Sequence, residues 1–86
     1  METSLLEFPC DFPIKVMGET QDGFAEAMLV LVKRHAPDFD PATLEMRASK
    51  GGRYISLTFT VRAVSQAQLD ALYSDITGHP MVVMAL

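Results

Sequence analysis

The sequence predicts an α+β fold in which two helices cover one face of a four-stranded antiparallel sheet. Residues 53–63 alternate apolar and polar side chains without a break, which indicates a strand with one buried face. Residues 21–36 and 65–78 instead carry apolar side chains at helical spacing. Three further short strands surround these segments, so the expected order is strand, helix, strand, strand, helix, strand.

The first part of the chain predicts an arm followed by a short strand. Residues 1–11 are expected to form the arm, because Pro9 and Pro13 prevent a long regular element there. Pro13–Met17 predicts the strand, and Gly18 suits the tight turn that leaves it. A chain of 86 residues suffices for one modest core, so residues 12–86 are expected to be a single domain.

The first helix is predicted from about Gln21, where the apolar residues change to a helical period. Thr20 or Asp22 is expected to cap its first turn, and Ala36-Pro37 is expected to end it. The apolar stripe of this helix consists of Phe24, Met28, Leu31, Val32 and His35.

The second and third strands are predicted as a hairpin, Ala42–Lys50 and Arg53–Ala63. Gly51-Gly52 joins them, and two glycines permit the positive φ angles of a tight turn. The inner face of the third strand is expected to hold Ile55, Leu57, Phe59 and Val61. Three methionines fall in registers that predict burial, where they would fill the core: Met28, Met46 and Met84.

The second helix and the last strand complete the predicted order. Ser65-Gln66-Ala67-Gln68 is a capping-box pattern, and Gly78 is expected to end the helix that it starts. Met81–Leu86 then predicts a strand that is apolar on both faces, with Met81, Val83 and Ala85 on one and Val82, Met84 and Leu86 on the other. Since the helices cover only one face, either the arm or another subunit is expected to cover the other.

This order corresponds to a ferredoxin-like βαββαβ two-layer sandwich. Two right-handed β-α-β crossovers place both helices on one side of the sheet and give the strand order 4-1-3-2. The second and fourth strands then become edges that need protection or a partner.

Composition and charge exclude several classes of function. The 7 Lys and Arg against 11 Asp and Glu give a net charge of −4, which argues against nucleic acid as a partner. Cys10 is the only cysteine, so no internal disulfide and no cysteine metal cluster are expected, and neither a metal nor a cofactor is predicted. No apolar run approaches the roughly 20 residues of a membrane span, and no signal peptide is recognisable. We therefore expect a cytoplasmic protein that does not bind membranes.

Five segments along the chain also carry a family resemblance. They are Leu5–Pro9, Phe12–Gly18, Arg34–Pro37, Ser49–Tyr54 and Leu72-Tyr73. In combination they resemble the YbeD-like family of small bacterial proteins of unknown function. The resemblance implies a stand-alone ferredoxin-like domain similar in fold to ACT-type regulatory domains, a bacterial origin and an association with lipoate metabolism. It implies no activity, and no site residue is carried over from it.

The loop after the first strand is the first candidate site. ACT-type domains often bind an amino acid where the first strand gives way to the first helix, and Gly18, Asp22 and Gly23 are similar in position. Amides at a helix start can hold a carboxylate. The alternative is structural, because any sharp strand exit favours Gly18 and any helix start favours Asp22. The usual Asp-x-Pro-Gly pattern is absent here.

The predicted hairpin is the second candidate site. Arg47, Lys50 and Arg53 gather around its glycines, next to the exposed Tyr54, and could bind an anion or an acidic protein. The alternative is a solvated turn whose charges protect a sheet edge.

No catalytic residues are predicted. His35 lies at a helix end and His79 between Gly78 and Pro80, so both are expected to be structural. The sequence therefore predicts a non-enzymatic regulatory or protein-interaction module that binds an unknown protein partner, a second copy of itself, or both. The alternative is a sensor of a small amino-acid-like molecule at the loop between the first strand and the first helix.

Overall fold

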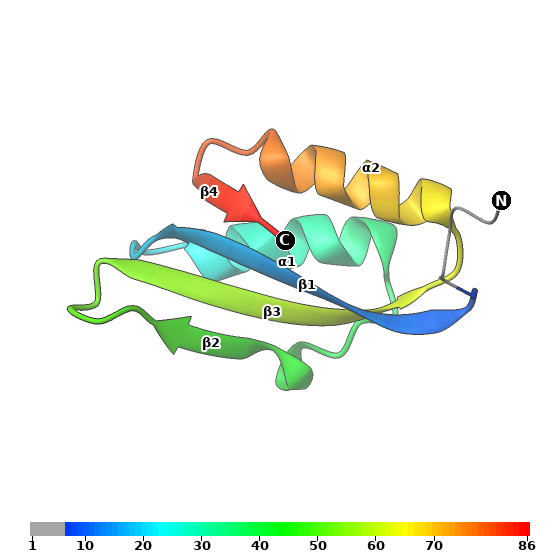
Figure 1. The fold of residues 1–86 in the computed structure, drawn as a ribbon, viewed down its shortest axis with the longest axis horizontal. Helices are drawn as coiled ribbons and strands as arrows, with labels where there is room; N and C mark the ends of the chain where they lie inside the picture. The colour runs from blue at the N-terminus through cyan, green and yellow to red at the C-terminus, as the bar shows by residue number, and fades with distance from the viewer. Residues whose placement is uncertain (1–6) are drawn as a thin grey trace, which may run out of the picture.

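The computed structural model describes residues 7–86, and its elements follow the predicted order (Figure 1). They are β1 (Cys10–Glu19), α1 (Phe24–His35), the short 3₁₀ helix η1 (Pro41–Thr43), β2 (Glu45–Ala48), β3 (Tyr54–Ala63), α2 (Gln66–Thr77) and β4 (Val82–Ala85). Among these described residues, no helix is long and apolar enough to cross a membrane.

The sheet confirms the predicted ferredoxin-like topology. Its strand order is β2-β3-β1-β4 and all three pairings are antiparallel. Ile14 lies opposite Phe59, and Val16 lies opposite Leu57, on the face that meets the helices. Figure 1 shows α1 and α2 together on one side of the sheet, so the opposite face of the sheet is left open.

The core fills the space between the sheet and the helices with apolar side chains alone. Every buried side chain in residues 7–86 is apolar, and Phe39, in the loop after α1, packs its ring 5.5 Å from that of Phe59. Each Val, Leu, Ile, Phe or Met side chain among them stabilises the fold by about 1.5–3 kcal/mol when fully buried. The interior of the described residues therefore holds only packed apolar side chains. Polar functional groups of this part of the chain lie at its surface.

β1 is longer than predicted. It spans Cys10–Glu19 instead of Pro13–Met17, because it pairs residue by residue with all ten positions of β3. Cys10 and Asp11, expected in the arm, lie in this strand opposite Ala63 and Arg62. Gly18, expected to leave the strand, also lies within it. Residues 1–6 of the predicted arm lie outside the described residues.

The helix starts confirm one predicted cap and correct the other. The hydroxyl of Ser65 accepts a hydrogen bond from the Gln68 amide at 3.1 Å, while the Gln68 side chain accepts one from the Val64 amide at 2.6 Å. The N-cap of α1 is Gly23, with φ at 85° and no side-chain cap. Neither Thr20 nor Asp22 caps this helix, because the left-handed backbone at Gly23 sets the turn instead.

β2 is shorter than predicted and is exposed along its whole length. Asp40 caps η1 by accepting a hydrogen bond from the Ala42 amide at 3.0 Å, so the strand begins at Glu45 instead of Ala42. Of the three methionines expected in the core, Met28 is buried, but Met46 is 60% exposed and Met84 is 48% exposed. The prediction for Met46 was wrong because the helices pack against β3 and β4 and have no comparable contact with β2.

A bulge changes the faces of β4. Val16 lies opposite Ala85 and Gly18 opposite Val82, so three residues of β1 face four of β4. Val82 and Ala85 therefore both pack against the core, although strict alternation placed them on opposite faces. Three apolar residues of this edge remain exposed in the described chain: Val83, Met84 and Leu86.

Candidate functional site

The open face of the sheet carries a groove over its β2 side. Strand register aligns residues of β2, β3 and β1 in rows across this face; one row is Glu45, Thr58 and Lys15, and the next is Arg47, Ser56 and Met17. The groove over these rows has a volume of about 230 Å³ and combines two cations, one carboxylate and two hydroxyls. This arrangement suits hydrogen bonding and charge pairing with an external group, and it places no titratable group in a buried position.

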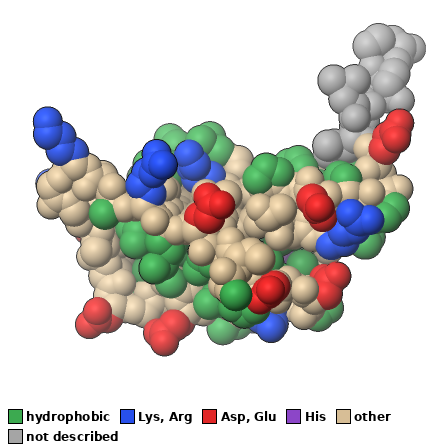
Figure 2. Space-filling model, turned by 90° about the horizontal axis from the view of Figure 1, so that it is seen from below, with side chains coloured by type: hydrophobic (Ala, Val, Ile, Leu, Met, Phe, Trp, Pro, Cys, Tyr) green, Lys and Arg blue, Asp and Glu red, His purple; other side chains and the backbone are tan. Residues whose placement is uncertain are grey.

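The hairpin beside this groove adds further positive charge. Gly51 and Gly52 form the turn as predicted, and the Tyr54 amide donates a hydrogen bond to the Ser49 hydroxyl at 3.0 Å. The Arg53 guanidinium lies 5.5 Å from the centre of the Tyr54 ring, a cation–π distance. Figure 2 shows Lys and Arg side chains gathered toward the end of the molecule where this hairpin lies.

These cations differ in their pairing from two arginines elsewhere in the described chain. Arg34 lies 3.6 Å from Asp75, and Arg62 lies 3.3 Å from Asp11. Within residues 7–86, by contrast, no ion pair involves the four basic residues near the groove and the hairpin, which are Lys15, Arg47, Lys50 and Arg53. We refer to these four as the hairpin cations. Their charge is available to a partner.

The sequence singled out only the hairpin part of this candidate site. Arg47, Arg53 and Tyr54 lie at one end of the sheet, and Tyr54, expected to be exposed, is half-buried. The groove adds Lys15, Ser56 and Thr58, for which the sequence predicted no role. The missing information was the register between β1 and β3, which joins Lys15 to the hairpin.

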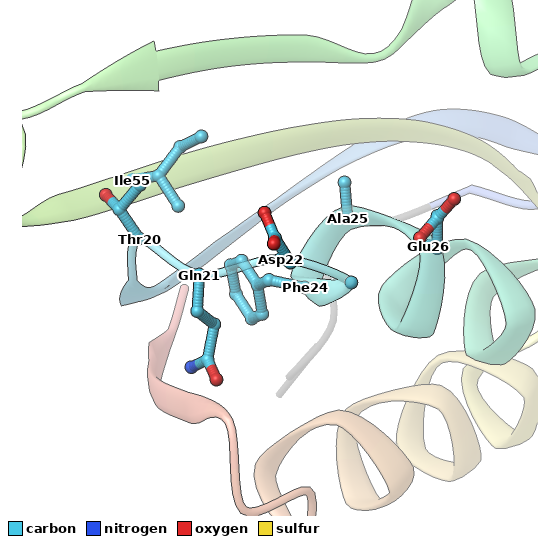
Figure 3. Close-up of a pocket in the computed structure, with 8 residues that line it drawn as sticks. Thr20, Gln21, Asp22, Phe24, Ala25, Glu26 and Ile55 are labelled. Carbon is cyan, nitrogen blue, oxygen red and sulfur yellow. The ribbon is translucent and has the colours of Figure 1, made fainter.

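The loop between β1 and α1 lines a second hollow, of about 230 Å³ (Figure 3). Asp22 and Gly23 line it, together with Gln21 and Glu26. In Figure 3 the Gln21 and Asp22 side chains point in opposite directions, and Glu26 lies beyond Ala25. The polar groups of this hollow therefore do not converge on one point.

Gly18 has a packing role next to this hollow. A Cβ atom at this position would lie 2.5 Å from the Met81 carbonyl oxygen and 2.7 Å from Cζ of Phe24. The glycine thus lets the Phe24 ring and the backbone before β4 approach the sheet. Among the three predicted loop residues, Gly18 does not line the hollow.

Both histidines have structural contacts, as predicted. His35 Nε2 donates a hydrogen bond to Asp75 Oδ2 at 2.6 Å, which ties α1 to α2. This bond holds the pKa of the Asp75 carboxyl below its ordinary value of 3.8, and the nearby charges of His35 and Arg34 act in the same direction. His79 Nδ1 accepts a hydrogen bond from the Met81 amide at 3.1 Å in the turn before β4.

Acidic groups and histidines are otherwise dispersed over the surface. In the part of the chain that the structure describes, no three His, Cys, Asp or Glu residues come close enough to hold a metal ion. Tyr73 is the other shifted group: burial raises its pKa above 10.0, and its hydroxyl donates to the Leu86 carbonyl oxygen at 2.8 Å.

Comparison with known proteins identifies the family. The profile of a family described as a protein of unknown function, DUF493, matches residues 3–86. The chain belongs to this family. The UPF0250 protein NE1487 of Nitrosomonas europaea is 56% identical over 85 residues, which cover 99% of this chain and 98% of the relative. A UPF0250 protein of Bordetella pertussis is 56% identical over 99% of this chain and 93% of its own length.

These relatives confirm the resemblance to the YbeD-like family, and neither of their names states an activity. A solved structure, that of protein HP0495 from H. pylori, aligns with a TM-score of 0.75 over 99% of this chain and 89% of that protein. Its sequence identity is 15%, so this likeness establishes the fold alone.

Proposed function

We propose that this protein is a non-enzymatic interaction module, which binds an acidic surface of a protein partner through the open sheet face at its hairpin end. The observation that carries the proposal is the clustering of charge. Four of the chain's seven Lys and Arg residues are the hairpin cations, although the net charge is −4. An acidic partner would therefore be attracted to one end of a molecule that otherwise repels it.

The groove supplies the other properties of a binding surface. The hydroxyls of Ser56 and Thr58 lie between the cations and offer hydrogen bonds in either direction. Tyr54, half-buried beside Arg53, adds a rigid aromatic contact of the kind that dominates many interfaces. The apolar interior supports a binding role over catalysis, because catalytic acids and bases usually need partly buried, convergent positions.

The test reverses two of these charges. Lys50→Glu with Arg53→Glu should remove a partner that co-purifies with the tagged chain from its native host, while the melting temperature stays within about 2 °C because both side chains are exposed surface groups. Lys33→Glu with Arg62→Glu changes the net charge equally and should keep the partner. The partner must then bind the purified chain directly. Equal loss in both double variants would contradict a role for the hairpin.

A sensor of a small molecule is the second candidate function. The hollow beside α1 favours it, because the loop that the sequence singled out does line a cavity. Its carboxylates, Asp22 and Glu26, would select the ammonium group of an amino-acid-like ligand. Binding to the folded state alone would raise the melting temperature by mass action. A panel of free amino acids that leaves both the melting temperature and the calorimetric heat unchanged would remove this candidate.

The association with lipoate metabolism that the family resemblance implies stays a prediction. The partner identified through the hairpin variants tests it directly, because that partner either does or does not act on lipoate or on lipoylated proteins.

A further inference from the structure

The free edge of β2 has backbone groups that can pair with another strand. β2 pairs only with β3 and ends the sheet, and all four of its residues are exposed. In an antiparallel pair, residues that exchange hydrogen bonds alternate with residues that do not. The Ser49 amide bonds to the Tyr54 carbonyl at 2.8 Å, so Arg47 and Glu45 also bond toward β3. Met46 and Ala48 therefore direct their amide and carbonyl groups to the free edge.

Three of the usual protections against pairing are absent from this short edge strand: a proline, a bulge and an inward-pointing charge. β2 has the sequence Glu-Met-Arg-Ala, and its register with β3 is unbroken over all four pairs. Its inner side, where charge would protect it, carries Met46, which is 60% exposed. An added strand would thus gain backbone hydrogen bonds and cover an apolar side chain.

The charges of β2 are complementary to a reversed copy of the same strand. Glu45 and Arg47 lie on the open face, on either side of Met46. When two antiparallel copies meet with Met46 opposite itself, Glu45 of each copy lies opposite Arg47 of the other. Opposite charges stabilise such directly facing pairs, and like charges destabilise them.

The neighbouring registers fail this test. Hydrogen bonds across the edge form only between residues whose amide and carbonyl groups point to the free edge. The next allowed registers therefore shift one copy by two residues relative to the other. One of them places Glu45 opposite Glu45, and the other places Arg47 opposite Arg47. Charge thus selects a single register among the three.

We propose that β2 pairs with β2 of a second copy of this chain, antiparallel and centred on Met46, to form a twofold-symmetric dimer with a continuous eight-stranded sheet. Such an interface is isologous, so each copy contributes the same surface. The dimer uses the edge of β2 and engages Arg47 alone among the hairpin cations, so Lys15, Lys50 and Arg53 stay free for the proposed partner. It would set two open faces side by side in one sheet.

Charge swaps test the register directly. Sedimentation of the full chain over a range of concentrations should show a reversible monomer–dimer equilibrium. Glu45→Arg and Arg47→Glu each create two like-charge pairs and should weaken dimerisation by about tenfold or more. The double variant, with both changes, restores opposite charges across the edge and should restore dimerisation. Asp70→Arg on α2 and Lys33→Glu on α1 are the charge-matched controls and should leave it unchanged.

A backbone test separates strand pairing from contact between faces. Met46→Pro removes an amide that points away from β3, so the fold should persist while the dimer is lost. Met46→Val keeps the amide and should keep the dimer. In the unmodified chain, hydrogen exchange at Met46 and Ala48 should slow as the concentration rises through the dimerisation range.

Three results would overturn the proposal. The first is a chain that stays monomeric at every concentration. The second is a dimer that the β2 variants do not weaken, which would place the interface elsewhere, for example at the apolar edge of β4. The third is a double charge swap that fails to restore a dimer lost in both single swaps. A variant that loses the partner but still dimerises separates this interface from the proposed function. A variant that keeps the partner but no longer dimerises does the same.

Discussion

Replacing Gly18 by alanine is the sharpest test of the packing between β1, α1 and β4. The added Cβ would lie 2.5 Å from the Met81 carbonyl oxygen, 2.7 Å from Cζ of Phe24 and 2.9 Å from its Cε1. Ordinary contacts of a Cβ atom begin at about 3.4 Å. The ring can shift, but the Met81 carbonyl belongs to the backbone, so the structure must move to accommodate the methyl group.

The expected loss follows from two opposing effects. Overpacking a tight interior costs about 1–3 kcal/mol, and a backbone obstacle favours the upper end of that range. Alanine also lowers the conformational entropy of the unfolded chain. This effect stabilises the fold by about 0.4–1 kcal/mol, since φ at Gly18 is not positive and alanine can adopt it. The net destabilisation is therefore about 2 kcal/mol, and at about 4–8 °C per kcal/mol for a domain of this size the melting temperature should fall by about 8–16 °C.

Urea unfolding and thermal melts followed by circular dichroism measure this change. Gly78→Ala is the comparison variant and should cost less, because its nearest contact would be 3.2 Å, longer than those at Gly18, and its backbone is right-handed helical. Phe24→Leu removes the two crowding ring atoms, so Gly18→Ala should cost less in that background than in the native chain. A Gly18→Ala protein with an unchanged or higher melting temperature would refute the reasoning.

Three further predictions concern the helices and the core. Because the pKa of Asp75 is lowered in the folded state, its ionised form stabilises the fold above its ordinary value of 3.8, and this contribution is lost as the pH falls through the lowered pKa. Asp75→Asn should therefore lower the melting temperature at about pH 5 and have less effect at about pH 2.5. Ser65→Ala should cost about 1 kcal/mol in urea unfolding by removing the cap of α2, and a cost near zero would contradict that role. Met28→Ala should cost about 2–5 kcal/mol through the cavity it leaves, whereas Met46→Ala, at an exposed position, should change stability by less than about 0.5 kcal/mol.

The sequence predicted the fold because the buried face of each element can be recognised from its local pattern. The alternation in residues 53–63 places Leu57, Phe59 and Val61 in the core, and the stripe from Phe24 to Val32 is buried as expected. Ser65 caps α2 as predicted because a capping box satisfies amides within one turn of chain. Apart from the cap of α1, the errors lie at β1, β2 and β4, where the length or face of a strand depends on its neighbour.

The candidate site was predicted only in part. Arg47, Lys50 and Arg53 are close in the chain, so their gathering around the hairpin could be expected. Lys15 joins them through the register of β1 on β3, over a separation that no local pattern encodes. Gly18 was interpreted as a turn residue, whereas the structure shows that it makes room for Phe24 and Met81.

By itself, the amino-acid order determined the two layers, the topology and the membership of one hydrophobic core, since periodicity shows which side of each element avoids water. Only the tertiary structure decided that Met46 is exposed, that a bulge turns Val82 inward, and that β2 ends the sheet with Glu45 and Arg47 on its open side. The physical reason is that burial at these positions depends on which distant elements arrive to cover them. The helices pack against β3 and β4, the inner face of β1 is buried in the same core, and β2 lies beyond them.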